Sequence, residues 1–318
     1  MHMKNIIFCI MAVLCLTGCK TSVADVEVGP YTISVIDENV YHIQDFNSTY
    51  QAGETFDTDG NKTHFNNCSD MYLIVGKKEA LLVDLSNNIK WADNAAESLR
   101  QLVSERIEEK PLTITFTHNH GDHTGMLHAF IDDKEVSYAM PETDFTRLVG
   151  RFPDLNYSFI KEGHLFDLGG IEVETIEVPG HTDGSVVFNI NGRDILLTGD
   201  AIGSGHGVWI FNTEAFRKYE SAVPHLISWL KDPENDVNID KLRIYGGHYW
   251  QRDWLPELEG KEMGMEYLND MQELINEIIS GTAAKEPSNL GRPDLDTYFR
   301  HGSAIVVWNA AQAEEYSR

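Results

Sequence analysis

The most restrictive feature of the sequence is the run THNHGDHTG at residues 117–125, which places three histidines and one aspartate within six positions. The preceding residues 112–116 are apolar and β-branched, as in a buried strand. Loops at the carboxyl ends of strands are where α/β proteins place their sites. Imidazole nitrogens and carboxylate oxygens suit a divalent transition metal, zinc first and iron or manganese next. The run therefore predicts a metal centre on an α/β fold.

The run also has room for two metals. His118 and His120 alternate along the loop and can point to one side, while Asp122 and His123 can reach a second metal ~3.5 Å away. Three protein donors per metal are the minimum, so more ligands must come from elsewhere. Three later glycine-flanked segments each follow a predicted strand, and they contain His181 in PGHT, Asp200 in TGDA and His248 in GGH.

In this order, the motifs make residues 67–248 resemble the metallo-β-lactamase-fold superfamily of metallo-hydrolases. The resemblance implies an α/β fold of the αββα sandwich type, in which two facing mixed β-sheets carry helices on their outer faces and hold the site along one edge. It also implies a ligand set. The first metal takes His118, His120 and His181, the second takes Asp122, His123 and His248, and Asp200 bridges both. Asp84, in the sequence LLVD, matches the family's buried aspartate that orients the metal loop.

The resemblance narrows the chemistry to hydrolysis of a small molecule. All the implied ligands are His or Asp, which is similar to the glyoxalase II-like and lactonase-like branches. Metallo-β-lactamases proper replace Asp200 by cysteine or lack it. We therefore expect a dinuclear hydrolase of an ester, thioester, lactone or amide. The two ions, Zn²⁺ before iron or manganese, would lower the pKa of a bridging water from ~15.7 toward ~7, so that hydroxide is the nucleophile. Asp122 and Asp200 would be catalytic by orienting that hydroxide.

Three other interpretations stay open at this stage. The chain could act on β-lactams, or it could be a mononuclear iron sulfur dioxygenase of the same fold. It could also be an envelope binding protein with a structural metal, although structural zinc sites leave no open position. For substrate contacts, the residues beside the ligands are the candidates, namely His206, Trp209, Tyr249 and Trp250.

The charge of the chain argues against nucleic acid as a partner. Fifty acidic and 25 basic residues give a formal net charge of −25. Phosphate backbones are bound by clustered Lys and Arg, which here are scattered. The charge argues against the nuclease branches of the superfamily, which share these ligands, and it favours neutral or small substrates.

The first residues resemble the export signal of bacterial lipoproteins. Residues 1–18 read as a signal peptide whose apolar stretch, residues 6–16, is too short to span a bilayer. It ends in LTGC, which resembles a lipobox and makes Cys19 the expected lipidated residue. We expect residues 19–29 to be a tether and residues 30–318 to be one catalytic domain. The protein is then lipid-anchored in the bacterial cell envelope and faces the periplasm or the exterior. The sequence carries no indication of its oligomeric state.

Apolar patterning predicts the elements of this domain. We expect helices at 91–107, 142–149, within 213–230 and at 261–279, the last ended by Gly281. We expect a hairpin around residues 76–78. The expected strands are 31–35, 40–43, 71–75, 80–83, 112–116, 136–139, 171–178, 185–190, 194–198 and 242–245.

The lipid anchor has a direct test. Cells that express the full chain should incorporate a clickable palmitate analogue into it, and Cys19→Ala should abolish the labelling because the thiol carries the diacylglycerol. Cys68→Ser, a change at the other cysteine left after cleavage, should keep it. Absence of label on the wild-type chain contradicts the anchor.

Overall fold

The computed structural model describes residues 26–45, 69–90, 92–204, 207–248 and 263–318. The expected signal peptide, Cys19 and most of the expected tether lie outside these residues. The same holds for three expected substrate contacts, His206, Tyr249 and Trp250. Within the described ranges, no helix combines the length and the apolar character needed to cross a bilayer.

Two sheets form the centre of the molecule. The first has eight strands in chain order: β1 (Val26–Val28), β2 (Tyr31–Asp37), β3 (Val40–Gln44), β4 (Asp70–Val75), β5 (Ala80–Val83), β6 (Leu112–Thr115), β7 (Val136–Pro141) and β8 (Tyr157–Ile160). The second has the order β14 (Arg243–Gly246), β12 (Ile195–Gly199), β11 (Val186–Ile190), β10 (Glu172–Glu177) and β9 (Leu165–Asp167). Both sheets are mixed, because β5 to β8 pair in parallel, as do β12 and β14, while the other pairs are antiparallel.

Parallel neighbours need crossover connections, and the helices supply most of them. Helix α1 (Ala95–Ile107) connects β5 to β6, and α3 (Glu142–Val149) connects β7 to β8. The short α2 (Gly121–Thr124) and a 3₁₀ turn, η1 (Leu127–Ala129), lie between β6 and β7. Helix α4 (Thr213–Lys231) and η2 (Pro233–Asn235) lie between β12 and β14.

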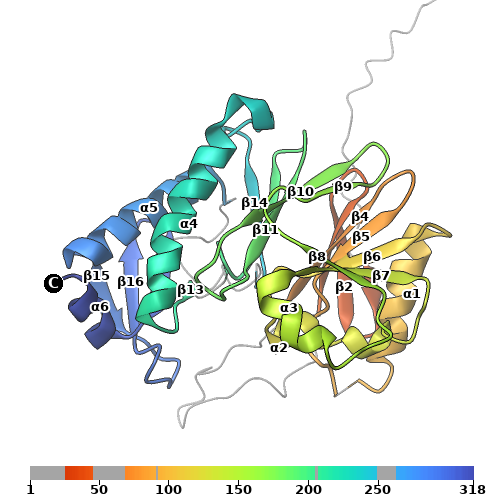
Figure 1. Cartoon of the computed structure of the whole chain (residues 1–318), viewed down its shortest axis with the longest axis horizontal. Coiled ribbons are helices and arrows are strands. Elements are labelled where there is room, and N and C mark those ends of the chain that lie inside the picture. The colour runs from red at the N-terminus through yellow and green to blue at the C-terminus, as the bar shows by residue number, and fades with distance from the viewer. Residues whose placement is uncertain (1–25, 46–68, 91, 205–206, 249–262) are drawn as a thin grey trace, which may run out of the picture.

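Alternating side chains build the layers. In β4 and β5, Leu73 and Leu82 pack in one core with α1, while Ile74 and Leu81 pack in another with Phe188 of the second sheet. The opposite face of the second sheet, including Ile176 and Leu196, packs against α4. Helices therefore cover the outer faces of two facing sheets (Figure 1). This confirms the expected αββα sandwich.

A third sheet, which the sequence analysis does not predict, lies beyond α4 and α5. It has the order β13 (Val208–Trp209), β17 (Ala304–Trp308), β16 (Thr297–His301) and β15 (Ala284–Pro287). Helix α5 (Met265–Ser280) packs against this sheet, and α6 (Ala310–Tyr316) follows β17 (Figure 1). The last strand that the sequence analysis names is 242–245, so it misses all four strands of this sheet. The missed signal is the two-residue turn at Gly302, whose φ is 53°, between a strand rich in β-branched and aromatic residues and an apolar strand.

Two local expectations are confirmed. The residues 76–78 join β4 and β5 as an antiparallel hairpin. Helix α5 ends at Gly281, whose φ of 72° is left-handed and whose N–H donates to the carbonyls of Glu277 and Ile278. The apolar residues spaced along one face of α5, including Met271 and Leu274, are buried in the core.

The two central sheets join beside Thr117. The amide of Val186 in β11 donates to the Thr117 carbonyl at 2.9 Å. Gly199, at the end of β12, has a φ of 50°, and a Cβ there would lie 2.3 Å from the Thr117 hydroxyl oxygen. A glycine is therefore required for the second sheet to approach the metal loop this closely.

Gly199→Ala tests this close approach against a matched glycine. Gly192 has a similar φ of 69°, but open space surrounds its Cβ position. Gly192→Ala should cost only the strain of a left-handed residue, about 1–2 kcal/mol. Gly199→Ala should cost more, and it should also lower the metal content because Thr117 must move. Thermal unfolding and metal analysis measure both, and equal losses in the two variants would refute the role of this contact.

Candidate metal centre

The expected ligands come from segments that follow strands of both central sheets. His118 and His120 lie in the loop after β6, and Asp122 and His123 lie on α2. The remaining three follow strands of the second sheet: His181 after β10, Asp200 after β12 and His248 after β14. Because facing sheets present these strand ends at a common edge, residues up to 130 positions apart in the sequence meet in one place.

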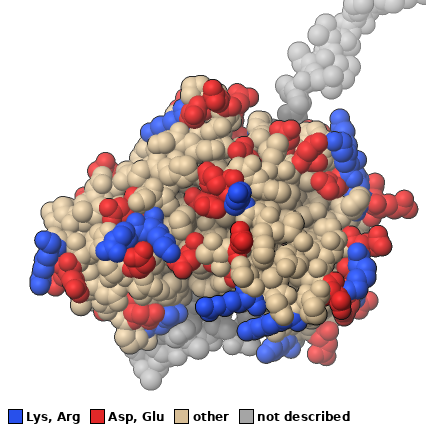
Figure 2. All heavy atoms as spheres, in the orientation of Figure 1, with Lys and Arg blue, Asp and Glu red and all other residues tan. Residues whose placement is uncertain are grey.

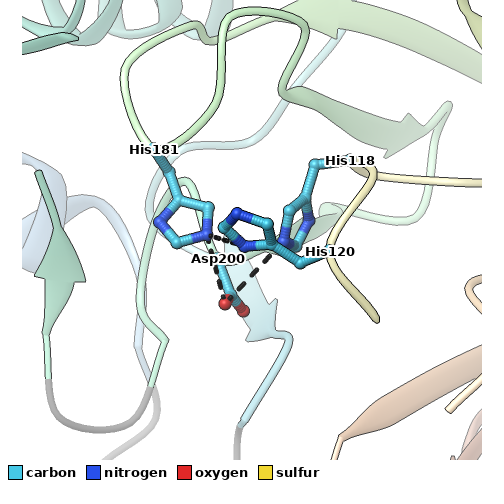
Figure 3. A group of neighbouring side chains, drawn as sticks. All are labelled: His118, His120, His181 and Asp200. Atoms are coloured by element: carbon cyan, nitrogen blue, oxygen red, sulfur yellow. Dashed lines mark hydrogen bonds and ion pairs between the residues drawn. The ribbon is translucent and has the colours of Figure 1, made fainter. Parts of the chain in front are cut away.

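One group consists of His118, His120, His181 and Asp200, whose candidate ligand atoms all lie within 4.8 Å of one another. The His181 Nε2 is 3.5 Å from Asp200 Oδ2, and the His118 Nε2 is 3.9 Å from the same oxygen. The His120 Nδ1 lies 2.9 Å from His181 Nε2. Figure 3 shows the three rings gathered around the carboxylate. The arrangement offers three nitrogens and one oxygen to a metal ion.

A second group consists of Asp122, His123, Asp200 and His248, within the same 4.8 Å limit. The His123 Nε2 lies 3.3 Å from Asp200 Oδ1. The His248 Nε2 lies 3.4 Å from Asp122 Oδ2 and 3.5 Å from Asp200 Oδ2. Asp200 therefore belongs to both groups: its Oδ2 lies near His118, His181 and His248, and its Oδ1 lies near His123. A carboxylate placed in this way could bridge two ions.

Orphaned nitrogens at the centre fit a metal. The Nε2 atoms of His118 and His123 are buried and find no hydrogen-bond partner among the described residues. Buried polar atoms are nearly always satisfied, so each such atom needs an explanation. Burial also lowers the pKa of His118, and it lowers that of His181 to about 4. Both rings are then neutral at pH 7, which is the form that binds a metal.

The electrostatics of the second group favour positive charge. Burial opposes ionisation of Asp122 and Asp200, but His123 and His248 hold the pKa of both carboxyls below the usual range. Burial likewise opposes the charge of His123 and His248, yet Asp200 and Asp122 raise the pKa of both rings. Two carboxylates, Asp200 buried and Asp122 partly buried, thus stabilise positively charged neighbours, and a divalent ion would be stabilised in the same way.

Asp84 lies where the resemblance implies. It follows β5 and is 1% exposed. Its carboxylate accepts hydrogen bonds from the Thr117 amide at 2.8 Å and from the Thr117 hydroxyl at 2.7 Å. It also accepts from His123 Nδ1 at 3.0 Å, which leaves Nε2 of that ring directed at the centre. Asp84 therefore fixes both the loop and the orientation of one ring.

The sequence analysis misses a second positioning carboxylate, Asp144 on α3. It accepts from the Asn119 amide at 3.1 Å in the metal loop. It also accepts from the Thr182 hydroxyl at 2.7 Å and the Gly184 amide at 2.8 Å, beside His181. Asp144 therefore ties two ligand-bearing loops together. No local pattern marks it, because an aspartate in the first turn of a helix is common for other reasons.

A third carboxylate, Asp45, is also missed. It follows β3 and accepts from the Ser69 amide at 2.9 Å and from the Asn87 side-chain amide at 2.7 Å. The Ser69 hydroxyl in turn donates to the Asp122 carbonyl at 2.5 Å. Asp45 therefore supports the start of α2, which carries Asp122.

Of the expected substrate contacts, only Trp209 lies within the described residues. Its carbonyl accepts a hydrogen bond from His181 Nδ1 at 3.1 Å, and its indole is partly buried. Its side chain lies beside Phe211, with ring centroids 6.4 Å apart. Phe211, which the sequence analysis misses, lies closer to the centre: its ring is 5.7 Å from that of His120 and 5.5 Å from that of His181.

Comparison with known sequences identifies relatives. The sequence model of the Metallo-beta-lactamase superfamily matches residues 69–234, slightly more than half of the chain. An atrochrysone carboxyl ACP thioesterase of Claviceps purpurea is 30% identical over 140 residues, which are 44% of this chain and 41% of the relative. A hydroxyacylglutathione hydrolase of Ruegeria pomeroyi is 35% identical over 89 residues, 28% of this chain and 33% of the relative. The chain thus spans less than half the length of these curated relatives.

Solved structures share the fold. A metallo-beta-lactamase from Pontibacter korlensis aligns with a TM-score of 0.54 at 16% identity and covers 77% of this chain and 99% of its own. A metallo beta lactamase from Erythrobacter litoralis aligns with a TM-score of 0.52 at 14% identity, covering 80% and 100%. At these identities the likeness concerns the fold.

Asp144→Asn tests whether this carboxylate positions the metal loops. The amide keeps the shape but offers one acceptor oxygen in place of two, so metal affinity should fall about 10- to 100-fold, as it does when outer partners of ligands are removed. Glu142→Gln, an exposed change on the same helix, should leave affinity unchanged. Competition with a chromophoric chelator measures both. Equal affinity of Asp144→Asn and wild type contradicts the assignment.

Proposed function

Because this chain belongs to the metallo-beta-lactamase superfamily, we propose that it is a dinuclear metal-dependent hydrolase of a small ester, thioester, lactone or amide. The observation that carries the proposal is the pair of donor groups that share Asp200. A structural site closes its coordination sphere with four protein ligands to a single ion. Two adjacent groups with a common carboxylate instead suit a pair of ions with solvent between them.

The residues that would hold the ions follow from these groups. His118, His120 and His181 face one side of Asp200, while Asp122, His123 and His248 face the other. The chemistry of the donors, nitrogen and oxygen without sulfur, fits zinc and also iron or manganese. Two such ions, when bound, supply Lewis acidity for a carbonyl and lower the pKa of a bound water.

The protein's own residues would orient the reacting water, accept its proton and hold the metal-binding rings in place. Asp200 and Asp122 are the acidic side chains that face the space between the groups, and they would orient a water and hold its proton. The Trp209 carbonyl and Asp84 fix the rings of His181 and His123 through the ring nitrogens remote from the centre. The site therefore needs little rearrangement when substrate binds.

Thioesters are the first substrates to test, because one of the relatives is a thioesterase. A polyanionic polymer is a poor match. Acidic and basic side chains are interspersed over most of the face in Figure 2, and the basic side chains along its lower edge form a short row and not the broad basic surface that phosphate backbones require.

Metal analysis together with a substrate panel tests the proposal. The purified chain should contain two divalent ions and hydrolyse at least one of a matched ester, thioester, lactone and β-lactam. Asp200→Ala or His120→Ala should abolish hydrolysis and lower the metal content, because each removes a donor that the groups need. His225→Ala, an exposed change on α4, should keep both properties. One iron per chain with oxygen consumption would instead identify a dioxygenase.

A further inference from the structure

We propose that Phe211 and Arg292 form a selective wall beside the metal centre, suited to a substrate whose reacting carbonyl carries an apolar arm that ends in a carboxylate. This inference rests on the proposed hydrolysis and names the substrate class for it. The sequence analysis contains neither residue. Arg292 also lies outside the residues that match the superfamily, so membership does not imply it.

Phe211 brings an apolar surface to the ligands. Its ring is nearly perpendicular to that of His120, at an interplanar angle of 86°, and it is also in contact range of His181. Both histidines belong to the first donor group. The side chain is only partly buried. A substrate held by its carbonyl at this group therefore has an aromatic surface for the adjoining part of its chain.

Arg292 places a cation against this surface. It lies between β15 and β16, and its guanidinium carbon is 5.4 Å from the Phe211 ring and 5.7 Å from the Trp209 ring. These distances are those of cation–π contacts. The guanidinium is ionised at every pH of interest, so it presents a permanent positive charge near the site.

Asp294 orients the guanidinium without using all of its donors. The pair consists of Nη2 to Oδ2 at 2.6 Å and Nε to Oδ1 at 3.2 Å. The Nη1 donors point to the opposite side of the planar group, because the five N–H bonds form a fixed fork. Asp294 thus restricts the rotation of Arg292, which lowers the entropic cost of binding a second carboxylate.

The order of these groups defines the arm of the substrate. The Phe211 ring is 5.7 Å from that of His120 and 5.4 Å from the Arg292 guanidinium carbon, so it contacts both groups. An arm with a single aromatic ring is suited to this arrangement. In a chain with a net charge of −25, anions are repelled at long range, so a carboxylate must be recognised by a local cation. Arginine and carboxylate form the strongest such pair.

The test compares two substrates of the same shape. The wild-type chain and Arg292→Gln are assayed with the N-acetylcysteamine thioesters of 4-carboxyphenylacetate and 4-carbamoylphenylacetate. Loss of the guanidinium should raise KM about tenfold for the carboxylate, because hydrogen bonds between charged groups are lost. It should leave KM for the neutral amide within about twofold, and kcat should change little for either.

A matched arginine controls for charge and stability. Arg300 on β16 also lies over an aromatic ring, Tyr298, at 5.3 Å, and it pairs with Glu286 at 2.7 Å. Arg300→Gln therefore makes the same change of charge in the same sheet away from Phe211. It should behave as the wild type with both substrates. Phe211→Leu should raise KM for both substrates alike, and metal content should be equal in all variants.

The outcomes separate this inference from the proposed hydrolysis. Equal effects of Arg292→Gln on both substrates, or the same effects in Arg300→Gln, overturn the wall. If the wild-type chain cleaves neither thioester, the proposed hydrolysis of this substrate class is refuted. Calorimetry with 4-carboxyphenylacetate and 4-carbamoylphenylacetate then tests whether Arg292 binds the carboxylate. Tighter binding of 4-carboxyphenylacetate that Arg292→Gln removes supports it. The absence of such a preference overturns it.

Discussion

The Asp84 carboxylate makes the interaction on which the centre depends. It accepts two hydrogen bonds from Thr117 and one from His123. A buried carboxylate is energetically costly unless it is hydrogen-bonded. Asp84 therefore needs these donors, and it also holds them in place. Thr117 also accepts from Val186 and packs against Gly199, both in the second sheet. One residue therefore transmits the position of Asp84 to both halves of the sandwich and to the ligands on either side.

Three buried carboxylates around the site act in the same way, by accepting hydrogen bonds from the segments that carry the candidate ligands. Asp84, Asp144 and Asp45 are each buried, and each holds a different part of the ligand set through backbone and hydroxyl donors. Asp144 connects the loops of His120 and His181, while Asp45 acts on Asp122 through Ser69. Such outer partners fix the ligand geometry before an ion binds. The arrangement also explains how ligands from both sheets converge although their loops are short.

How much of the fold and of the candidate site can be predicted from the sequence depends on how far apart in the sequence the interacting residues lie. The histidine loop is predictable, because it concentrates its donors within six residues, and the sandwich follows from the family resemblance that the loop and the later motifs carry. Asp84 is found through the resemblance. Asp144 and Phe211 are not, because their roles come from contacts across 25 to 91 residues of sequence that no local pattern marks. The third sheet is missed although its hairpin has a recognisable turn at Gly302.

The third sheet lies beside both the candidate ligands and the proposed wall. Its strand β13 pairs with β17, and the Ile210 amide donates to the Val307 carbonyl at 2.9 Å. The same short stretch of chain presents the Trp209 carbonyl to His181 and the Phe211 ring to His120. The sheet also supplies Arg292 from its β15–β16 connection. Because the stretch 209–211 holds both the His181 ring, through the Trp209 carbonyl, and the Phe211 ring, a shift of its main chain should alter specificity and metal affinity together, whereas loss of the Phe211 or Arg292 side chain alone should alter specificity.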